Sequence, residues 1–323
     1  MTKPISLHDS FLAARRIAPH ILGTPLERSA VLSAELGREV WLKLESQQRT
    51  GSFKLRGALN RLLTLPAEAR ARGVLTCSAG NHGLGVAEAA RLTGIRATIV
   101  VPENASPAKV EALHRTGSEL LLLGADYDAA EALAPQIAEQ RRLAFVSPYD
   151  DPFVIAGAGT VALEIMRDLP EVGTILVPVG GGGLASGVGI VAKGINPGVR
   201  IVGVQSEASP SMVAALAAGR LVTVECTDTL ADGLAGNIAP GAITFPLVRD
   251  HLDEVITVTE AAIGAAMRTF LDRHHLVVEG SGAVGLAALQ SGHLPPLPEP
   301  IVLIVSGSNV ASTVLAGVLR SDE

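Results

Sequence analysis

Short apolar segments alternate along the chain with longer segments whose apolar residues recur at helical spacing. The short segments, bounded by Gly, Pro, Asp and Ser, predict strands, and the longer ones, such as residues 84–93 and 161–168, predict helices. This alternation predicts a parallel α/β fold. No shift in composition along the sequence marks a domain boundary. The expected strands are residues 39–44, 73–76, 97–101, 119–123, 144–146, 175–179, 200–204, 254–258 and 301–305.

Composition narrows the class of protein. The chain has 323 residues, 48% of them hydrophobic, and a mean hydropathy of +0.37, enough for a large core in one or two domains. A net charge of −6 with dispersed Lys and Arg argues against a nucleic-acid partner. Two cysteines favour a reducing compartment. Residues 1–18 lack a signal-peptide core, and Pro178 and four glycines interrupt the apolar segment 174–195, so we expect a soluble cytoplasmic protein without membrane contact.

Three motifs carry the candidate chemistry. Residues 50–58 place Lys54 in a polar, glycine-bearing turn at the start of a helical segment; alone, such a lysine is more often an ordinary surface residue. Residues 78–83 and 180–184 each follow an expected strand with glycines and then a helix start, an arrangement that directs backbone N–H groups at an anion. A lysine that can form an imine, together with two anion cradles, indicates a pyridoxal 5'-phosphate site for an amino acid substrate.

The chain resembles the fold-type-II pyridoxal phosphate enzymes, in the threonine/serine dehydratase and serine racemase branch. The resemblance runs nearly end to end and implies a doubly wound large domain, residues 1–72 and 149–323, with a smaller inserted α/β domain, residues 73–148. The cofactor is expected in the cleft between them, and the assembly as a homodimer or homotetramer. The motifs that carry the resemblance are residues 51–58, 78–82, 148–152, 180–184, 231–233, 279–283 and 306–310.

The resemblance also implies residue roles. Lys54 would carry the cofactor, with Phe53 against its ring, Asn81 on its phenolic oxygen and glycine N–H groups around its phosphate. A hydroxyl at Ser306 cannot force protonation of the ring nitrogen, which favours β-elimination over transamination. The cofactor residues implied are Phe53, Lys54, Asn81, Gly180, Gly181, Gly182, Gly183, Leu184, Gly233, Glu279 and Ser306. Those implied for the substrate are Ser78, Ala79, Gly80, Asn81 and His82.

Other interpretations exist for several of these residues. His82 could simply begin a helix, Ser78 or Asn81 could cap one, and Glu279 could pack or cap. The glycines also fit a relaxed dinucleotide motif, which would make the chain a non-catalytic nucleotide-binding module, but this leaves Lys54 and residues 78–82 unexplained. His274 and His275 are adjacent on an expected helix, so they point apart and form no metal site.

We therefore expect an ammonia-lyase that dehydrates L-threonine or L-serine to 2-oxobutanoate or pyruvate, with Lys54 as the base at Cα. Related racemases carry serine where this chain has Ala79, which disfavours racemisation. Relatives that bind a divalent cation carry acids where this chain has Gln205 and Ser211, so no metal is expected.

The sequence does not decide which 3-hydroxy amino acid is the physiological substrate. Leu84 and Ala158, commonly glutamine in dehydratases, suggest an altered side-chain pocket. Residues 229–232 and 277–280 also resemble the dehydratases of hydroxyectoine breakdown, so a larger 3-hydroxy amino acid, including 3-hydroxyaspartate or phenylserine types, is the alternative. The chain ends soon after Ser308, so we expect no appended regulatory domain.

Overall fold

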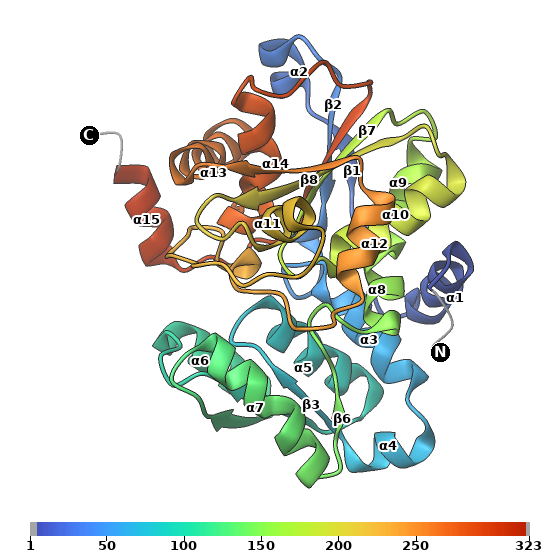
Figure 1. The fold of residues 1–323 in the computed structure, drawn as a ribbon, viewed down its shortest axis with the longest axis vertical. Coiled ribbons are helices and arrows are strands. Elements are labelled where there is room, and N and C mark those ends of the chain that lie inside the picture. The colour runs from blue at the N-terminus through green and yellow to red at the C-terminus, as the bar shows by residue number, and fades with distance from the viewer. Residues whose placement is uncertain (1–4, 321–323) are drawn as a thin grey trace.

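The computed structural model describes residues 5–320, which form two sheets one above the other in Figure 1. Within this range, the larger sheet has six strands in the order β1-β2-β10-β7-β8-β9, and the smaller has four in the order β5-β4-β3-β6. Every neighbouring pair is parallel except β1 and β2. The predicted α/β class is confirmed, and strands from both chain ends share the larger sheet.

All of the predicted strands are present, with ends within two residues of the expected ones. The edge strand β1 was missed because it is three residues long, largely exposed and contains a single apolar residue. The strands are β1 Leu26–Arg28, β2 Val40–Leu44, β3 Val74–Cys77, β4 Ala97–Val101, β5 Glu119–Leu122, β6 Ala144–Phe145, β7 Thr174–Pro178, β8 Arg200–Ser206, β9 Glu254–Val258 and β10 Ile301–Val305.

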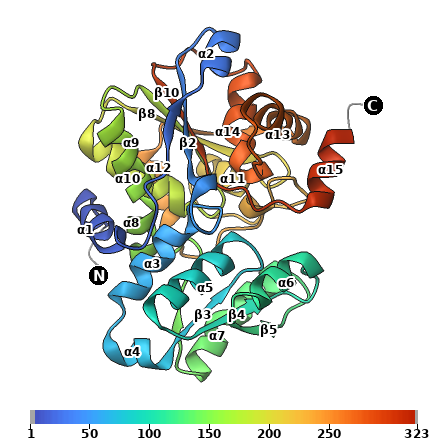
Figure 2. The same cartoon turned by 180° about the vertical axis from the view of Figure 1, so that it is seen from behind.

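Helices cover both faces of each sheet (Figures 1 and 2). On the larger sheet, α9 and α10 pack on one face, and α13 and α14 on the other. On the smaller, α7 lies opposite α5 and α6. The helices are α1 Leu7–Ile17, α2 Ala30–Leu36, α3 Lys54–Thr64, α4 Ala67–Arg72, α5 Asn81–Thr93, α6 Pro107–His114, α7 Tyr127–Gln140, α8 Pro152–Ala158, α9 Thr160–Asp168, α10 Gly183–Ile195, α11 Ser211–Ala218, α12 Thr244–His251, α13 Glu260–His274, α14 Gly280–Gln290 and α15 Ser312–Arg320, with 3-10 turns η1 Glu45–Gln47 and η2 Asp232–Leu234.

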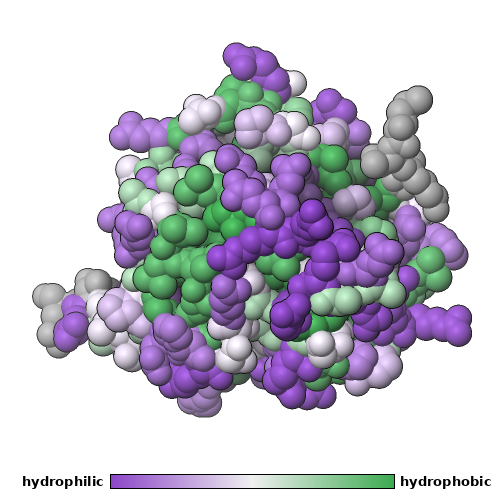
Figure 3. Space-filling view, turned by 90° about the horizontal axis from the view of Figure 1, so that it is seen from below, coloured by the Kyte–Doolittle hydropathy of each residue, from purple (hydrophilic) through white to green (hydrophobic). Residues whose placement is uncertain are grey.

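The central strands β3, β4, β7 and β10 are fully buried, which explains why they appear in the sequence as short, continuously apolar segments. Viewed from the end that carries the smaller sheet, the surface is mostly hydrophilic, with hydrophobic areas between the polar side chains (Figure 3). Over residues 5–320, no helix combines the length and apolar character needed to cross a bilayer.

Candidate active site

A cavity of about 680 Å³ is lined by residues that follow the carboxyl ends of strands in both sheets. Ser78 follows β3, Gly180 lies just beyond β7, and Ser306 follows β10. The carboxyl ends of parallel strands are where α/β folds collect ligand-binding loops. All of the residues singled out from the sequence as cofactor or substrate contacts line this one cavity.

Lys54 is the first residue of α3 and lines the cavity. The turn before it is tied to β10, because the Phe53 N–H donates to the Ser306 carbonyl at 3.1 Å and Ser52 bridges to Gly307. The Lys54 ammonium donates to the Pro148 carbonyl at 2.9 Å and lies 5.3 Å from the centre of the Phe53 ring. Burial lowers the pKa of Lys54 to about 8, although the charges of Glu279 and Glu131 oppose this.

The loop of residues 180–184 begins α10 with free backbone donors. Over residues 5–320, the N–H groups of Gly181, Gly182 and Gly183 donate to no protein acceptor, as expected at a helix N-terminus. Gly182 has a φ of +90°, and a Cβ on Gly181 would lie 2.4 Å from the ring of Tyr149. The loop is thus confined to glycine here, and its free N–H groups fit a phosphate. The donor set therefore fits the phosphate of pyridoxal 5'-phosphate.

The second cradle is the start of α5. The N–H groups of Ala79, Asn81 and His82 also lack acceptors within the described chain, while that of Gly80 donates to the Ser78 hydroxyl at 3.1 Å. The Asn81 side chain is held at both ends: its Nδ2 donates to Glu279 at 2.7 Å and its Oδ1 accepts from Asn309 at 2.7 Å. These bonds fix the direction of the amide that was expected to contact the cofactor.

The His82 side chain is uncharged, so it cannot bind an anion as a cation would. It is 2% exposed, and burial together with the nearby Lys54 charge lowers its pKa to about 3, so the imidazole is neutral. Its Nε2 lies 3.2 Å from the Val146 carbonyl, which can only accept, so Nε2 carries the proton and Nδ1, without a partner among residues 5–320, is an acceptor. A carboxylate at this place would therefore be bound by the His82 backbone N–H.

Glu279 is a buried carboxyl that lines the cavity and is 4% exposed. Burial and the charge of Asp232 raise its pKa to about 7, against the bonds from Asn81 and the Asn309 backbone. Gly307 leaves room for it, because a Cβ there would lie 2.4 Å from a Glu279 oxygen. Glu279 is thus more than the packing or capping residue of the alternative interpretation, since it positions Asn81.

The structure shows where three residues that depart from the family pattern lie. Leu84 packs in the core between α5 and β4, and Ala158 is buried in the larger core, and neither lines the cavity. The structure therefore gives no support to the expectation that these two residues alter the side-chain pocket. Ala79, in contrast, does line the cavity.

Ser211 begins α11, and the side chain of Gln205, a residue of β8, reaches the start of that helix. The Gln205 Oε1 accepts the N–H groups of Met212 and Val213 at 3.0 Å, so its amide serves as a helix cap. Among residues 5–320, no group of three or more His, Cys, Asp or Glu side chains is placed to hold a metal ion. Metal independence stays a prediction.

The sequence analysis missed Lys109 and Tyr127, which also line the cavity. Lys109 on α6 forms an ion pair with Asp232 in η2 at 2.5 Å. This ion pair connects a helix of the smaller sheet with a turn on the side of the larger sheet. Tyr127 donates to Glu131 at 3.1 Å on α7. Single polar residues on helices outside a motif carry no sequence signal that would have pointed to them.

Comparison with known proteins agrees with this geometry. Residues 17–307 match the family model described as pyridoxal-phosphate dependent enzyme. The chain is 45% identical to an L-threonine ammonia-lyase of Geobacter sulfurreducens, covering 91% of this chain and 73% of that one, and 40% identical to a catabolic L-threonine dehydratase of Escherichia coli, covering 95% and 94%.

Among solved structures, the fold matches a maize serine racemase with a TM-score of 0.91 and 36% identity, covering 99% of this chain and 98% of that one. The fold, the lysine between two sets of free N–H groups and the match over residues 17–307 lead to one conclusion: the chain belongs to the pyridoxal-phosphate-dependent enzymes.

Proposed function

We propose that the protein is a pyridoxal phosphate-dependent ammonia-lyase that converts L-threonine to 2-oxobutanoate and ammonia, and L-serine to pyruvate and ammonia. The observation that carries this proposal is a lysine of lowered pKa between two helix N-termini with free N–H groups in one cavity. Identities of 40–45% to L-threonine ammonia-lyases and dehydratases over most of the chain support it.

Each part of the cofactor has residues that suit it. Lys54 would attach it, the N–H groups of residues 180–184 would bind its phosphate, and Asn81 would bind its phenolic oxygen. Ser306 would face the ring nitrogen without protonating it. When bound, pyridoxal phosphate supplies a conjugated ring that withdraws electrons from the substrate Cα.

The chain's own groups would then bind the substrate and move its protons. The free N–H groups at the start of α5 would hold the substrate carboxylate, which fixes which bond at Cα faces Lys54. The Lys54 amine, with its pKa lowered to about 8, is partly unprotonated near neutral pH and can accept the Cα proton. Loss of that proton and of the β-hydroxyl gives, after hydrolysis, the 2-oxo acid and ammonia.

Elimination is favoured over racemisation by what lies at residue 79. Racemisation needs a second acid–base group on the opposite face of Cα, and the Ala79 methyl cannot donate or accept a proton there. For the larger-substrate alternative, Leu84 and Ala158 give no support, because they lie outside the cavity.

The organisation of the molecule is part of the proposal. We propose a cofactor-binding body of residues 1–72 and 149–323 and a substrate-binding body of residues 73–148, assembled as a homodimer or homotetramer in the cytoplasm. The free thiols of Cys77, which is buried, and Cys226 suit a reducing compartment. The smaller sheet contains strands β3 to β6 only, which supports this division.

The test is a substrate panel with protein reconstituted with pyridoxal phosphate. L-threonine, L-serine and larger 3-hydroxy amino acids are supplied in turn, and the 2-oxo acid and ammonia are quantified, with Lys54→Ala as the control. We expect equal amounts of both products, a preference for L-threonine or L-serine, and no turnover by the control. Turnover of a larger substrate alone would move the assignment to the alternative, and no turnover of any 3-hydroxy amino acid would refute it.

A further inference from the structure

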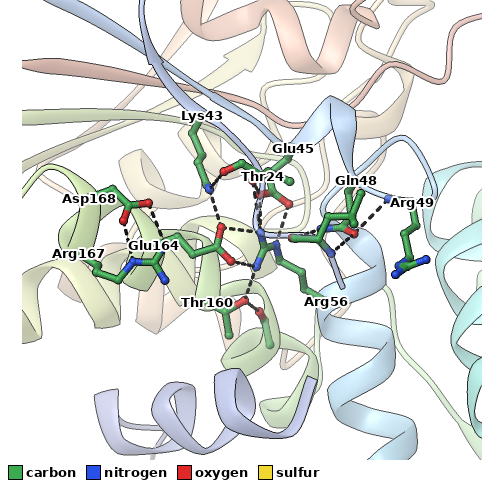
Figure 4. A network of polar contacts seen from close by, with 12 residues as sticks. Thr24, Lys43, Glu45, Gln48, Arg49, Arg56, Thr160, Glu164, Arg167 and Asp168 are labelled. Carbon is green, nitrogen blue, oxygen red and sulfur yellow. Dashed lines mark hydrogen bonds and ion pairs between the residues drawn. The ribbon is translucent and has the colours of Figure 1, made fainter. Parts of the chain in front are cut away.

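Arg56 lies two residues after Lys54, in the first turn of α3. Residues two apart on a helix point to nearly opposite sides, so Arg56 is directed away from the cavity that Lys54 enters. Its side chain is completely buried, between η1, the start of α9 and the loop that holds Thr24 (Figure 4). A buried guanidinium behind a candidate catalytic lysine needs an explanation.

The guanidinium is held by two carboxylates, each on two of its nitrogens. Glu45 accepts from Nε and Nη2, both at 2.8 Å, and Glu164 accepts from Nη1 at 2.6 Å and Nη2 at 2.9 Å. The Thr160 hydroxyl accepts from Nη1 at 3.2 Å. Because the planar fork is bound from two directions, it can neither rotate nor shift without losing bonds.

A second cation completes a neutral cluster. Lys43 is also completely buried, and its ammonium donates to Glu164 at 2.5 Å and to the Thr24 carbonyl at 2.6 Å. Burial acts to raise the pKa of Glu164, but the bonds and charges of Arg56 and Lys43 hold it below its ordinary value, so the carboxylate is ionised. The cluster of Lys43, Glu45, Arg56 and Glu164 is called the arginine clamp below.

The arginine clamp joins α3 to the larger sheet. Lys43 belongs to β2, Glu45 to the turn η1 directly after it, and Glu164 to α9, which packs on the sheet. The glycine loop that would bind the phosphate follows β7 in this same sheet. Lys54 is therefore tied, through Arg56, to the sheet that positions the phosphate cradle.

The remaining sides of α3 pack against α5 and α8, where its buried leucines share one core cluster with Val86 and Val154. Glycines let the helix backbones approach closely there. A Cβ on Gly157 of α8 would lie 2.6 Å from the Arg56 carbonyl, and a Cβ on Gly85 of α5 would lie 3.1 Å from the Lys54 carbonyl carbon. Further along α3, Asn60 donates to the Phe153 carbonyl of α8 at 2.7 Å. At the first turn of α3, beside Lys54, the arginine clamp supplies the directional side-chain bonds.

We propose that Arg56 is a positioning residue: through its forked bonds to Glu45 and Glu164, it fixes the first turn of α3 and thereby the place of the Lys54 amine relative to the glycine loop. Arg56 does not line the cavity, so in this proposal it acts through Lys54. The inference rests on the proposed role of Lys54. It requires the planar fork, so a lysine of the same charge cannot substitute for Arg56.

The test compares Arg56→Lys with Arg200→Lys, a matched control. Arg200 pairs with Glu254 between β8 and β9, so the control makes the same chemical change in an ion pair of the larger sheet that does not touch α3. In the proteins without cofactor, competitive acetylation over a pH series with peptide mass spectrometry measures the pKa of Lys54. In the reconstituted proteins, kcat and KM are measured with the best substrate.

For Arg56→Lys we expect the pKa of Lys54 to rise from about 8 by about one unit, because a displaced first turn admits water and relieves the burial that lowers it. We expect kcat to fall on the order of 10²-fold with little change in KM, since the amine is misplaced by a fraction of an ångström to an ångström. Arg200→Lys should leave both quantities unchanged.

The inference would be overturned if Arg56→Lys folds and its Lys54 pKa and kcat equal those of Arg200→Lys. If Arg56→Lys does not fold, Glu164→Gln decides, because it keeps the Glu45 fork: a smaller change in the same direction supports the clamp, and none refutes it. Trapping of the cofactor in the wild type separates the two proposals. A label away from Lys54 refutes the proposed function, whereas a label on Lys54 with unaffected variants refutes only the role of Arg56.

Discussion

At the scale of single residues, the cavity combines groups whose protonation is set by burial. Lys54 is brought to a pKa of about 8 and Glu279 to about 7, while His82 is kept neutral. The sequence predicted that these residues share a site, because they occur in motifs. It could not predict the proton position on His82 or the bond from Asn81 to Glu279, since these depend on contacts between residues far apart in the chain.

Ala79→Ser is the residue change that most directly addresses reaction type. A hydroxyl at this place would give the cavity a group that can exchange a proton on the face of Cα away from Lys54. We expect the ratio of D-serine formed to pyruvate formed from L-serine to increase, whereas elimination should dominate in the wild type. Chiral chromatography of the remaining serine measures this ratio. Wild-type D-serine formation as fast as pyruvate formation would contradict the assignment.

Glu279 gives a prediction on pH and stability in the protein without cofactor. A carboxyl whose pKa rises on folding, from 4.5 to about 7, favours the folded state fully below pH 4.5 and loses that contribution as the pH rises to 7. Glu279→Gln is uncharged throughout and has no such loss. Relative to the wild type, we therefore expect the variant to gain roughly 3 kcal/mol of unfolding free energy between pH 4.5 and pH 8.

Urea unfolding of the wild type and Glu279→Gln at pH 4.5 and pH 8 measures that difference. A constant gap between the two proteins at both pH values would show that Glu279 titrates in the folded protein as it does when unfolded, and that its burial has no electrostatic cost.

At the scale of elements, several helices begin at the cavity, and three of them carry the sequence motifs: α3 with Lys54, α5 with Asn81 and α10 with Gly183. Their starts were predictable, because a strand, glycines and a helical segment follow one another in the sequence. The packing that brings α3 against α5 and α8 was not predictable. It depends on single glycines inside helices, Gly57, Gly85 and Gly157, whose partners are distant in the chain.

Gly157→Ala tests that packing. Its Cβ would lie 2.6 Å from the Arg56 carbonyl and 2.7 Å from the Gly57 Cα, so α3 and α8 must separate. We expect a loss of about 1–3 kcal/mol of unfolding free energy and a weaker affinity for pyridoxal phosphate, because α3 carries Lys54. Gly317→Ala on α15 is the control, since a Cβ there would meet no atom of residues 5–320 within 4 Å and should stabilise by up to about 1 kcal/mol.

Denaturant unfolding and a titration followed by cofactor absorbance provide the two quantities. If both glycine variants behaved alike, close contact between α3 and α8 would not matter for the placement of Lys54.

At the scale of the whole molecule, strands from both ends of the chain join in one sheet, and an intervening segment forms the other. The alternation of apolar segments was sufficient to predict the strands and the α/β class, because parallel strands are buried on both faces. Strand order was beyond that pattern, since it is decided by which helices cover which face. The short antiparallel edge strand β1 was not predicted, because it has only three residues and is largely exposed.

Stability of the folded molecule also tests metal independence. The Gln205 side-chain oxygen accepts hydrogen bonds from the start of α11. Neither Gln205 nor Ser211 supplies the negative charge that a divalent cation requires. We expect the thermal midpoint and kcat to be unchanged by EDTA or by millimolar Mg²⁺ at fixed ionic strength. A cation at 100 times its dissociation constant would add roughly 2.7 kcal/mol, a shift of several degrees that differential scanning fluorimetry would detect.

The central claim is that this cavity holds pyridoxal phosphate on Lys54, and reductive trapping tests it most directly. Protein reconstituted with the cofactor is treated with borohydride, digested, and its peptides are sequenced by mass spectrometry. We predict that the reduced cofactor is found on Lys54 and that Lys54→Ala retains none. A label on another lysine, or a protein that takes up no cofactor and stays colourless, would contradict the account.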